Sequence, residues 1–268
     1  MEFQILSDLH LETPASYDIF DIPPKAPHLA LLGDIGNVRD EGFFLFLEAQ
    51  LRQFHTVFFV LGNHEPFHSS WAEARNLILE FSTDVAVRAD AEGLGEFVFL
   101  DQTRYDVSND LTILGCTLYS HVPPEHEEDV RCGLNDFYQI DDWTVEAHNA
   151  AHAANVKWLN EQVLSISRSE PGRRIVILTH HSPIIDDPRV IDPAHADSPI
   201  LSGFATNMKG EECWKNANVI MWTFGHTHFN CDFTVDDEKA TRKRIFSNQR
   251  GYYFKQAAGF DVTNVVNA

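Results

Sequence analysis

The chain has 268 residues, an ordinary apolar fraction of 44% and a formal net charge of −20 at pH 7. This length is enough to bury a large core, and no repeat, linker or low-complexity tract divides the chain, so we expect one domain over residues 1–268. The negative charge argues against tight binding to a long nucleic acid, because the acidic surface would repel its phosphates.

The longest apolar runs, such as residues 57–61, are far too short to cross a bilayer. Acidic residues begin at Glu2 and Asp8, where a secretory signal would need a basic segment followed by an apolar one. The cysteines show no CxxC spacing, which predicts free thiols in a reducing compartment. They are Cys116, Cys132, Cys213 and Cys231. We therefore expect a soluble cytoplasmic protein.

Three apolar runs in the first quarter of the chain predict strands at residues 3–6, 29–32 and 56–61. Apolar residues at helical spacing over residues 41–54 predict a helix that connects the second strand to a parallel third strand. A second helix is predicted at about residues 71–81. This alternation of strands and helices predicts an α/β fold.

The rest of the chain continues this pattern. Its predicted elements are strands at 97–100 and 111–119, a helix at about 144–165, strands at 174–178 and 219–224, and antiparallel closing strands near 231–235 and 244–248. Two long stretches without a clear period, about 121–142 and 182–207, are predicted to be surface loops that wall a substrate pocket.

Metal-binding residue types follow five of the apolar strands, directly after each strand ends. They are Asp8 and His10, Asp34, Asn63 and His64, His180 and His181, and His226 and His228. Open α/β sheets build their sites at the carboxyl ends of strands. In an extended backbone, residues two apart such as Asp8 and His10 would point to the same side. Oxygen and imidazole donors in this number suit two adjacent cations, with Asp34 as the bridge between them.

Each motif also has an ordinary structural interpretation. Asp34 could cap the helix that follows it, Asn63 could be a turn residue, and the histidines could be polar residues at strand ends. Because five motifs occur in the same structural context, we favour the metal-site interpretation.

The motifs resemble those of the calcineurin-like metallophosphoesterases and occur in the order typical of that family. They are Asp8-Leu9-His10, Gly33-Asp34, Gly62-Asn63-His64-Glu65, His180 and Gly225-His226-Thr227-His228. The resemblance implies a four-layer α/β sandwich with two mixed central β-sheets flanked by helices. A group of uncharacterised bacterial and fungal phosphohydrolases is also similar at Asn248-Gln249-Arg250-Gly251-Tyr252.

The resemblance implies a ligand set for two ions. One ion would be held by Asp8, His10, Asp34 and His228, and the second by Asp34, Asn63, His180 and His226. Either His180 or the adjacent His181 could be the ligand at this position, and we choose His180 because it is nearer the strand. In the family, the residue matching His64 contacts the substrate phosphate and helps the leaving group depart. Asn37 stands where many relatives have an acidic residue. In the family this position supports the metal ligands and does not itself bind metal, so the difference leaves the ligand set unchanged.

The predicted reaction is hydrolysis of a small phosphodiester or phosphomonoester. Two cations would screen the charge on the ester and lower the pKa of a bridging water, which then acts as hydroxide. His64, protonated and steadied by Glu65, would stabilise the departing alkoxide. Mixed histidine and carboxylate ligands suit Mn, Fe or Zn better than Mg. Arg131, Arg189 and Arg250 are candidate phosphate contacts.

Two alternatives remain. A nuclease on the same scaffold is disfavoured by the acidic charge and by the lack of a long basic stretch with aromatic residues. A non-catalytic interaction scaffold is the other alternative, because a fold alone does not guarantee chemistry. Decay of a site should delete or replace ligands, and here every expected ligand type and His64 are present. A small-molecule phosphoesterase is therefore the favoured prediction.

Overall fold

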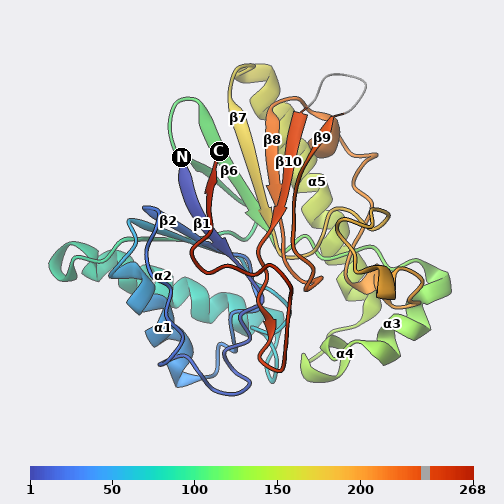
Figure 1. Cartoon of the computed structure of the whole chain (residues 1–268), viewed down its shortest axis with the longest axis horizontal. Coiled ribbons are helices and arrows are strands. Elements are labelled where there is room, and N and C mark those ends of the chain that lie inside the picture. The colour runs from blue at the N-terminus through green and yellow to red at the C-terminus, as the bar shows by residue number, and fades with distance from the viewer. Residues whose placement is uncertain (237–241) are drawn as a thin grey trace.

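The computed structural model describes residues 1–236 and 242–268. Two β-sheets face each other at its centre, and helices cover the outer side of each, which gives the four layers visible in Figure 1. Both sheets contain parallel and antiparallel pairs. The predicted α/β sandwich with two mixed sheets is confirmed.

The first sheet has the strand order β13-β1-β2-β3-β4. Its strands are β1 (Glu2–Leu6), β2 (His28–Leu31), β3 (Thr56–Phe59), β4 (Glu96–Phe99) and β13 (Val265–Asn267). β1 to β4 run parallel, and β13 pairs antiparallel with β1. The carboxyl ends of β1, β2 and β3 therefore meet at one edge of this sheet.

The second sheet has the order β5-β6-β7-β8-β10-β9. Its strands are β5 (Thr103–Asp106), β6 (Leu111–Cys116), β7 (Arg174–Thr179), β8 (Val219–Thr223), β9 (Cys231–Asp236) and β10 (Arg242–Ser247). β5 was not predicted. β10 is antiparallel to β9, as predicted. β9 lies at the outer edge of the sheet and β10 lies between β8 and β9, so β10 runs parallel to β8.

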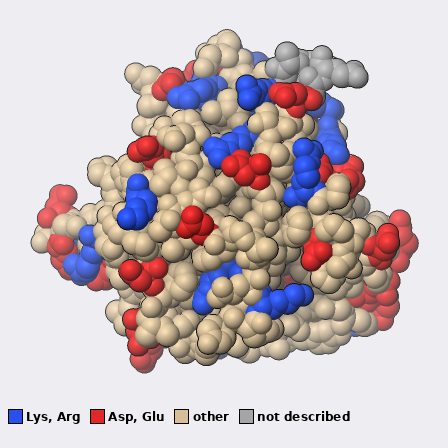
Figure 2. Space-filling model, in the orientation of Figure 1, with Lys and Arg blue, Asp and Glu red and all other residues tan. Residues whose placement is uncertain are grey.

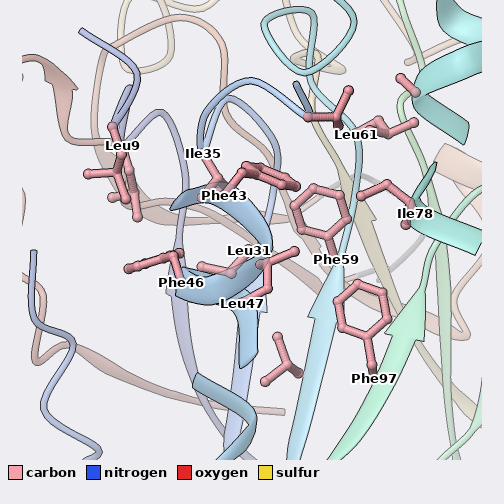
Figure 3. Close-up of a cluster of buried hydrophobic side chains, with 14 of the residues drawn as sticks. Leu9, Leu31, Ile35, Phe43, Phe46, Leu47, Phe59, Leu61, Ile78 and Phe97 are labelled. Carbon is pink, nitrogen blue, oxygen red and sulfur yellow. The ribbon is translucent and has the colours of Figure 1, made fainter. Parts of the chain in front are cut away.

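Residues of β3 show why these apolar runs form central strands. Val57 and Phe59 face a cluster that includes Phe43 and Leu47 of α1 (Glu41–Leu51), and Figure 3 shows Phe59 beside them. Phe58 points the other way, into the cluster between the two sheets. Successive strand side chains alternate between faces, so a strand covered on both sides needs apolar residues at every position.

Helix α2 (Trp71–Glu92) is eleven residues longer than the predicted 71–81. Its second half buries only Val85, so the sequence there lacks an apolar stripe. Ion pairs of Arg88 with Asp84 and Glu92 one turn away support this half instead. The helix ends at Gly93, whose left-handed φ of 65° forms its C-cap.

The stretch 121–142, predicted as a loop, contains two short helices, α3 (Glu127–Gly133) and α4 (Asp136–Gln139). Neither is long enough to give a periodic apolar pattern. The helix predicted at 144–165 is α5 (Val145–Ser169), which covers the second sheet. Among the described residues, the remaining α-helix is α6 (Glu212–Lys215), and β11 (Gly251–Tyr252) forms a hairpin with β12 (Lys255–Gln256).

All four cysteines are free, as predicted. Within the described ranges, no helix is both long and apolar enough to span a membrane.

Replacing Phe58 by alanine should lower the free energy of unfolding by about 3–5 kcal/mol, because it removes a fully buried ring from between the sheets. Denaturant titration of both proteins measures this loss. Leu79→Ala is the control, since Leu79 is 51% exposed on α2, and it should change the free energy by less than about 0.5 kcal/mol. Equal losses in the two variants would contradict the assignment of the inter-sheet core.

Candidate metal centre

The loops that follow β1, β2, β3, β7 and β8 bring the predicted ligands together at one end of the sandwich. All of them are buried except His228, which is partly exposed. Six of the seven belong to overlapping groups of potential metal ligands within the part of the chain that is described, and one of these groups also contains His64. Asn63 joins them through its contact with His180. The seven residues are Asp8, His10, Asp34, Asn63, His180, His226 and His228.

One group surrounds the ring of His180. Its Nε2 lies 3.1 Å from Oδ1 of Asn63 and 3.2 Å from Nδ1 of His226. The same nitrogen lies 3.6 Å from Oδ1 of Asp34. Asp8 contributes an oxygen to this group as well.

The second group surrounds the ring of His10. Its Nε2 lies 3.0 Å from Nε2 of His228 and 3.9 Å from Oδ2 of Asp34. Nε2 of His228 lies 3.3 Å from Oδ1 of Asp8. Asp34 therefore directs one carboxylate oxygen toward each group.

Hydrogen bonds on the far side of these side chains fix which atoms face the centre. Nδ1 of His180 lies 2.8 Å from the carbonyl oxygen of Leu32, which can only accept, so this nitrogen carries the proton. Nδ2 of Asn63 donates to Oδ1 of Asp136 at 2.8 Å. An unprotonated nitrogen and an amide oxygen thus face each other, and such acceptors repel unless a cation lies between them. The donor set fits a metal centre.

The electrostatic environment supports the same conclusion. Burial lowers the pKa of both His10 and His180 to about 4, which keeps these rings in the neutral form that binds metals. Burial, opposed by the charge of His64, raises the pKa of Asp34 well above its ordinary value. Cations bound nearby would lower this pKa and favour the ionised carboxylate.

The backbone that positions these residues is not extended, and the prediction of strand-like alternation for Asp8 and His10 was wrong. Both are left-handed, with φ of 54° and 47°, and Asp34 has φ of 54°. His226 and His228 have φ of 68° and 48°. Each left-handed residue costs roughly 1–2 kcal/mol, which the surrounding packing must offset.

Gly33 and Gly62 allow the loops after β2 and β3 to approach each other closely. Gly33 has φ of 85°, and a Cβ there would lie 2.4 Å from the backbone nitrogen of Gly62. A Cβ on Gly62 would lie 2.3 Å from Oδ1 of Asp34. A larger residue at either position would displace the carboxylate that joins the two groups.

Glu65 does not contact the ring of His64, so its predicted steadying role was wrong. Its carboxylate accepts hydrogen bonds from the backbone nitrogens of Gly62, Asp34 and Ile35 at 2.7, 3.0 and 2.8 Å. Glu65 therefore ties together the loops that carry Asp34 and His64.

Glu12 is the carboxylate that holds His64, and sequence reasoning missed it. Its Oε1 lies 2.8 Å from Nδ1 of His64 and 3.3 Å from Nδ1 of His10. Burial lowers the pKa of His64, but the charges of Asp34 and Glu12 outweigh it and raise the pKa to about 9. The alternation of polar residues at Asp8, His10 and Glu12 was the sequence pattern that could have indicated this role.

Asn37 stands where many relatives have an acidic residue. Its side-chain Nδ2 donates a hydrogen bond to the carbonyl oxygen of Phe67.

The structure separates the two adjacent histidines. His180 faces Asp34 and Asn63, as described above. His181 is buried, and its ring lies 4.3 Å from that of His226, but it belongs to none of the ligand groups formed by the described residues. The geometry therefore favours the choice of His180.

The three candidate arginines do not reach this site. Arg131 pairs with Glu128, and Arg189 pairs with Asp187. Nη1 of Arg250 donates to the carbonyl oxygen of Leu9. None of the three lines the adjoining cavity, so the prediction of phosphate contacts was wrong.

A cavity of about 510 Å³ adjoins the metal-binding residues. Asp34, His64, His226 and His228 line it, together with residues of both predicted loops. A third part of the lining, Tyr252 and residues 255–258 at the β11-β12 hairpin, was not predicted. The site therefore opens into a space that holds a small ligand.

Comparisons with known proteins agree with this geometry. The model of the calcineurin-like phosphoesterase family matches residues 1–230. An uncharacterized protein of Acanthamoeba polyphaga mimivirus is 24% identical over 267 residues, covering 92% of this chain and 90% of that protein. The structure of a phosphopantetheinyl hydrolase from Mycobacterium tuberculosis is similar, with a TM-score of 0.61, 16% identity, and coverage of 93% of this chain and 89% of that one.

Replacing Asp136 by alanine should weaken metal binding roughly 10–100-fold, because Nδ2 of Asn63 loses the acceptor that turns its Oδ1 toward the site. Elemental analysis after dialysis against a weak chelator measures the bound metal. Asp136→Asn keeps an acceptor oxygen and should retain most of it. If Asp136→Ala binds metal as tightly as the wild type, Asn63 does not depend on this contact.

Proposed function

Because the chain belongs to the calcineurin-like phosphoesterase family and is a metal-dependent phosphoric ester hydrolase, we propose that this site hydrolyses a small phosphodiester or phosphomonoester. The observation that carries the proposal is the placement of Asp34. Its Oδ1 lies near His180, and its Oδ2 lies near His10. A carboxylate that offers a different oxygen to each of two donor sets is an arrangement suited to a dinuclear centre.

The residues would divide between two ions as the family resemblance implies. Asp8, His10, Asp34 and His228 would hold one, and Asp34, Asn63, His180 and His226 the other. When bound, the pair supplies positive charge to the ester and makes water a nucleophile at neutral pH. Neutral imidazoles with carboxylates favour Mn, Fe or Zn.

His64 would serve as the general acid for the leaving group. The carboxylate of Glu12 accepts a hydrogen bond from Nδ1 of His64. This contact orients the imidazole ring and stabilises its protonated form. Nε2 lies at the cavity side, 3.5 Å from the hydroxyl of Tyr252 and 4.0 Å from Oδ2 of Asp34. A proton on Nε2 can therefore pass to a leaving oxygen bound beside Asp34.

The alternative of a nuclease gains no support from the charge distribution. Lysines and arginines on the face shown in Figure 2 lie in separate patches among acidic and uncharged residues. Tracking a nucleic-acid strand needs a continuous basic groove with stacking aromatic rings. The alternative of an inactive scaffold is disfavoured because the potential ligand atoms converge on one place in the structure.

Asp34→Asn should remove both ions together. It should lower turnover by more than roughly 100-fold, which is the largest loss usual for removing a residue that only hydrogen-bonds to a metal ligand. Metal content and hydrolysis of bis(p-nitrophenyl) phosphate, each measured with Mn, Zn and Mg, test this prediction. Activity within a few-fold of the wild type would show that Asp34 does not join the two ions.

His64→Ala should leave the metal content unchanged and lower turnover about 10²–10⁴-fold for esters with poor leaving groups. Esters with good leaving groups need less help from a proton donor and should lose less activity. The measurement compares kcat for alkyl and nitrophenyl esters of the same acid. Equal losses for both classes would argue against a general acid at this position.

A further inference from the structure

The cavity beside the metal centre has an apolar wall built on its own small core. Leu134, Ile200 and Phe204 line the cavity. The same residues pack in or against the buried cluster of Val122, Val130, Leu134 and Val145. A wall anchored in this way is formed before any ligand arrives, so it can bind an apolar group with little cost in ordering.

This wall begins directly beside the metal-binding residues. The ring of Phe204 stacks on that of His226, with centroids 4.7 Å apart and an interplanar angle of 24°. A phosphate held at the centre would therefore have the apolar wall next to it on the side of His226.

A different aromatic residue borders the other side of the centre. The ring centroid of Tyr252 lies 4.3 Å from that of His10 and 4.9 Å from that of His228. Its hydroxyl lies 3.5 Å from Nε2 of His64, the proposed proton donor. The leaving group lies on this side to receive the proton, which leaves the wall at Phe204 available to the arm that remains on phosphorus.

Charges around the cavity limit how many phosphates it can take. Lys255 is the single lysine or arginine among the described residues that line it. Asp34, Asp136 and Asp192 also line it. With one basic and three acidic side chains around it, the cavity suits a substrate with a single negative charge. A polyphosphate or a nucleic-acid strand would bring further negative charges that no basic side chain of the lining neutralises.

We propose, building on the phosphoesterase function above, that the preferred substrate is a singly charged phosphodiester with one apolar arm. That arm, aromatic or aliphatic, lies on the wall of Leu134, Ile200 and Phe204 and stays on phosphorus. Water loses a proton to the solvent as its oxygen forms the new P–O bond, the P–O bond to the other arm breaks, and that arm leaves as an alcohol with the proton from His64. The solvent then returns a proton to His64. The products are a monoester that keeps the apolar arm and a free alcohol.

The kinetic test uses diesters with one leaving group, p-nitrophenolate, and different retained arms. The metal-loaded protein should hydrolyse phenyl p-nitrophenyl phosphate with a kcat/KM about tenfold or more above that of methyl p-nitrophenyl phosphate, because the phenyl arm becomes buried. It should also prefer the phenyl diester to the monoester p-nitrophenyl phosphate. Equal rates for phenyl and methyl arms, or preference for the monoester, would overturn the assignment of substrate.

A binding test is independent of turnover. Methylphenylphosphinate and dimethylphosphinate carry the same single charge and cannot be hydrolysed, and calorimetry with the metal-loaded protein should show about tenfold tighter binding of the phenyl compound. Ile200→Asn should reduce both the binding ratio and the kinetic ratio to near one. Ile19→Asn is the matched control, because Ile19 is 76% exposed and lies outside this cavity, and it should leave both ratios unchanged.

The outcomes separate the two proposals. Absence of hydrolysis of every ester with Mn, Fe and Zn would overturn the phosphoesterase mechanism and the substrate assignment together. Hydrolysis without preference for the phenyl arm would overturn the substrate assignment alone. A preference that survives in Ile200→Asn would show that the apolar arm binds elsewhere.

Discussion

Repulsion between electron-pair donors is the constraint on which the rest of this structure depends. Around Asp34, the Nε2 atoms of His10 and His180, an amide oxygen and two carboxylates lie close together among buried side chains, and Nδ1 of each of these two rings faces an acceptor oxygen. Such a cluster is unstable by itself and becomes favourable when cations occupy its centre. The chain must therefore hold the donors in place by other means until the ions bind.

The sandwich supplies that rigidity. Strands buried on both faces end together at one edge, and the loops that follow them turn sharply through left-handed residues such as Asp8 and Asp34. Glu65 fixes two of these loops through three backbone hydrogen bonds, and glycines let the backbones approach. Strain at the site is thus offset by core packing elsewhere in the protein.

The sequence was sufficient for the order of most strands and helices and for the residues that converge, because apolar runs ending in ligand-type residues are local patterns. It was insufficient where contacts join distant segments. Glu12 contacts His64, Asp136 orients Asn63 from a short helix, and Tyr252 with residues 255–258 completes the lining of the cavity. The second half of α2 was missed for a different reason, since ion pairs rather than an apolar stripe support it.

Anomalous X-ray diffraction from crystals of the protein loaded with Mn or Zn tests the central claim most directly. We predict two anomalous peaks per chain, with Oδ1 and Oδ2 of Asp34 each in coordination distance of a different ion. A single peak, or two peaks of which only one contacts Asp34, would contradict the account of a dinuclear centre joined by this carboxylate.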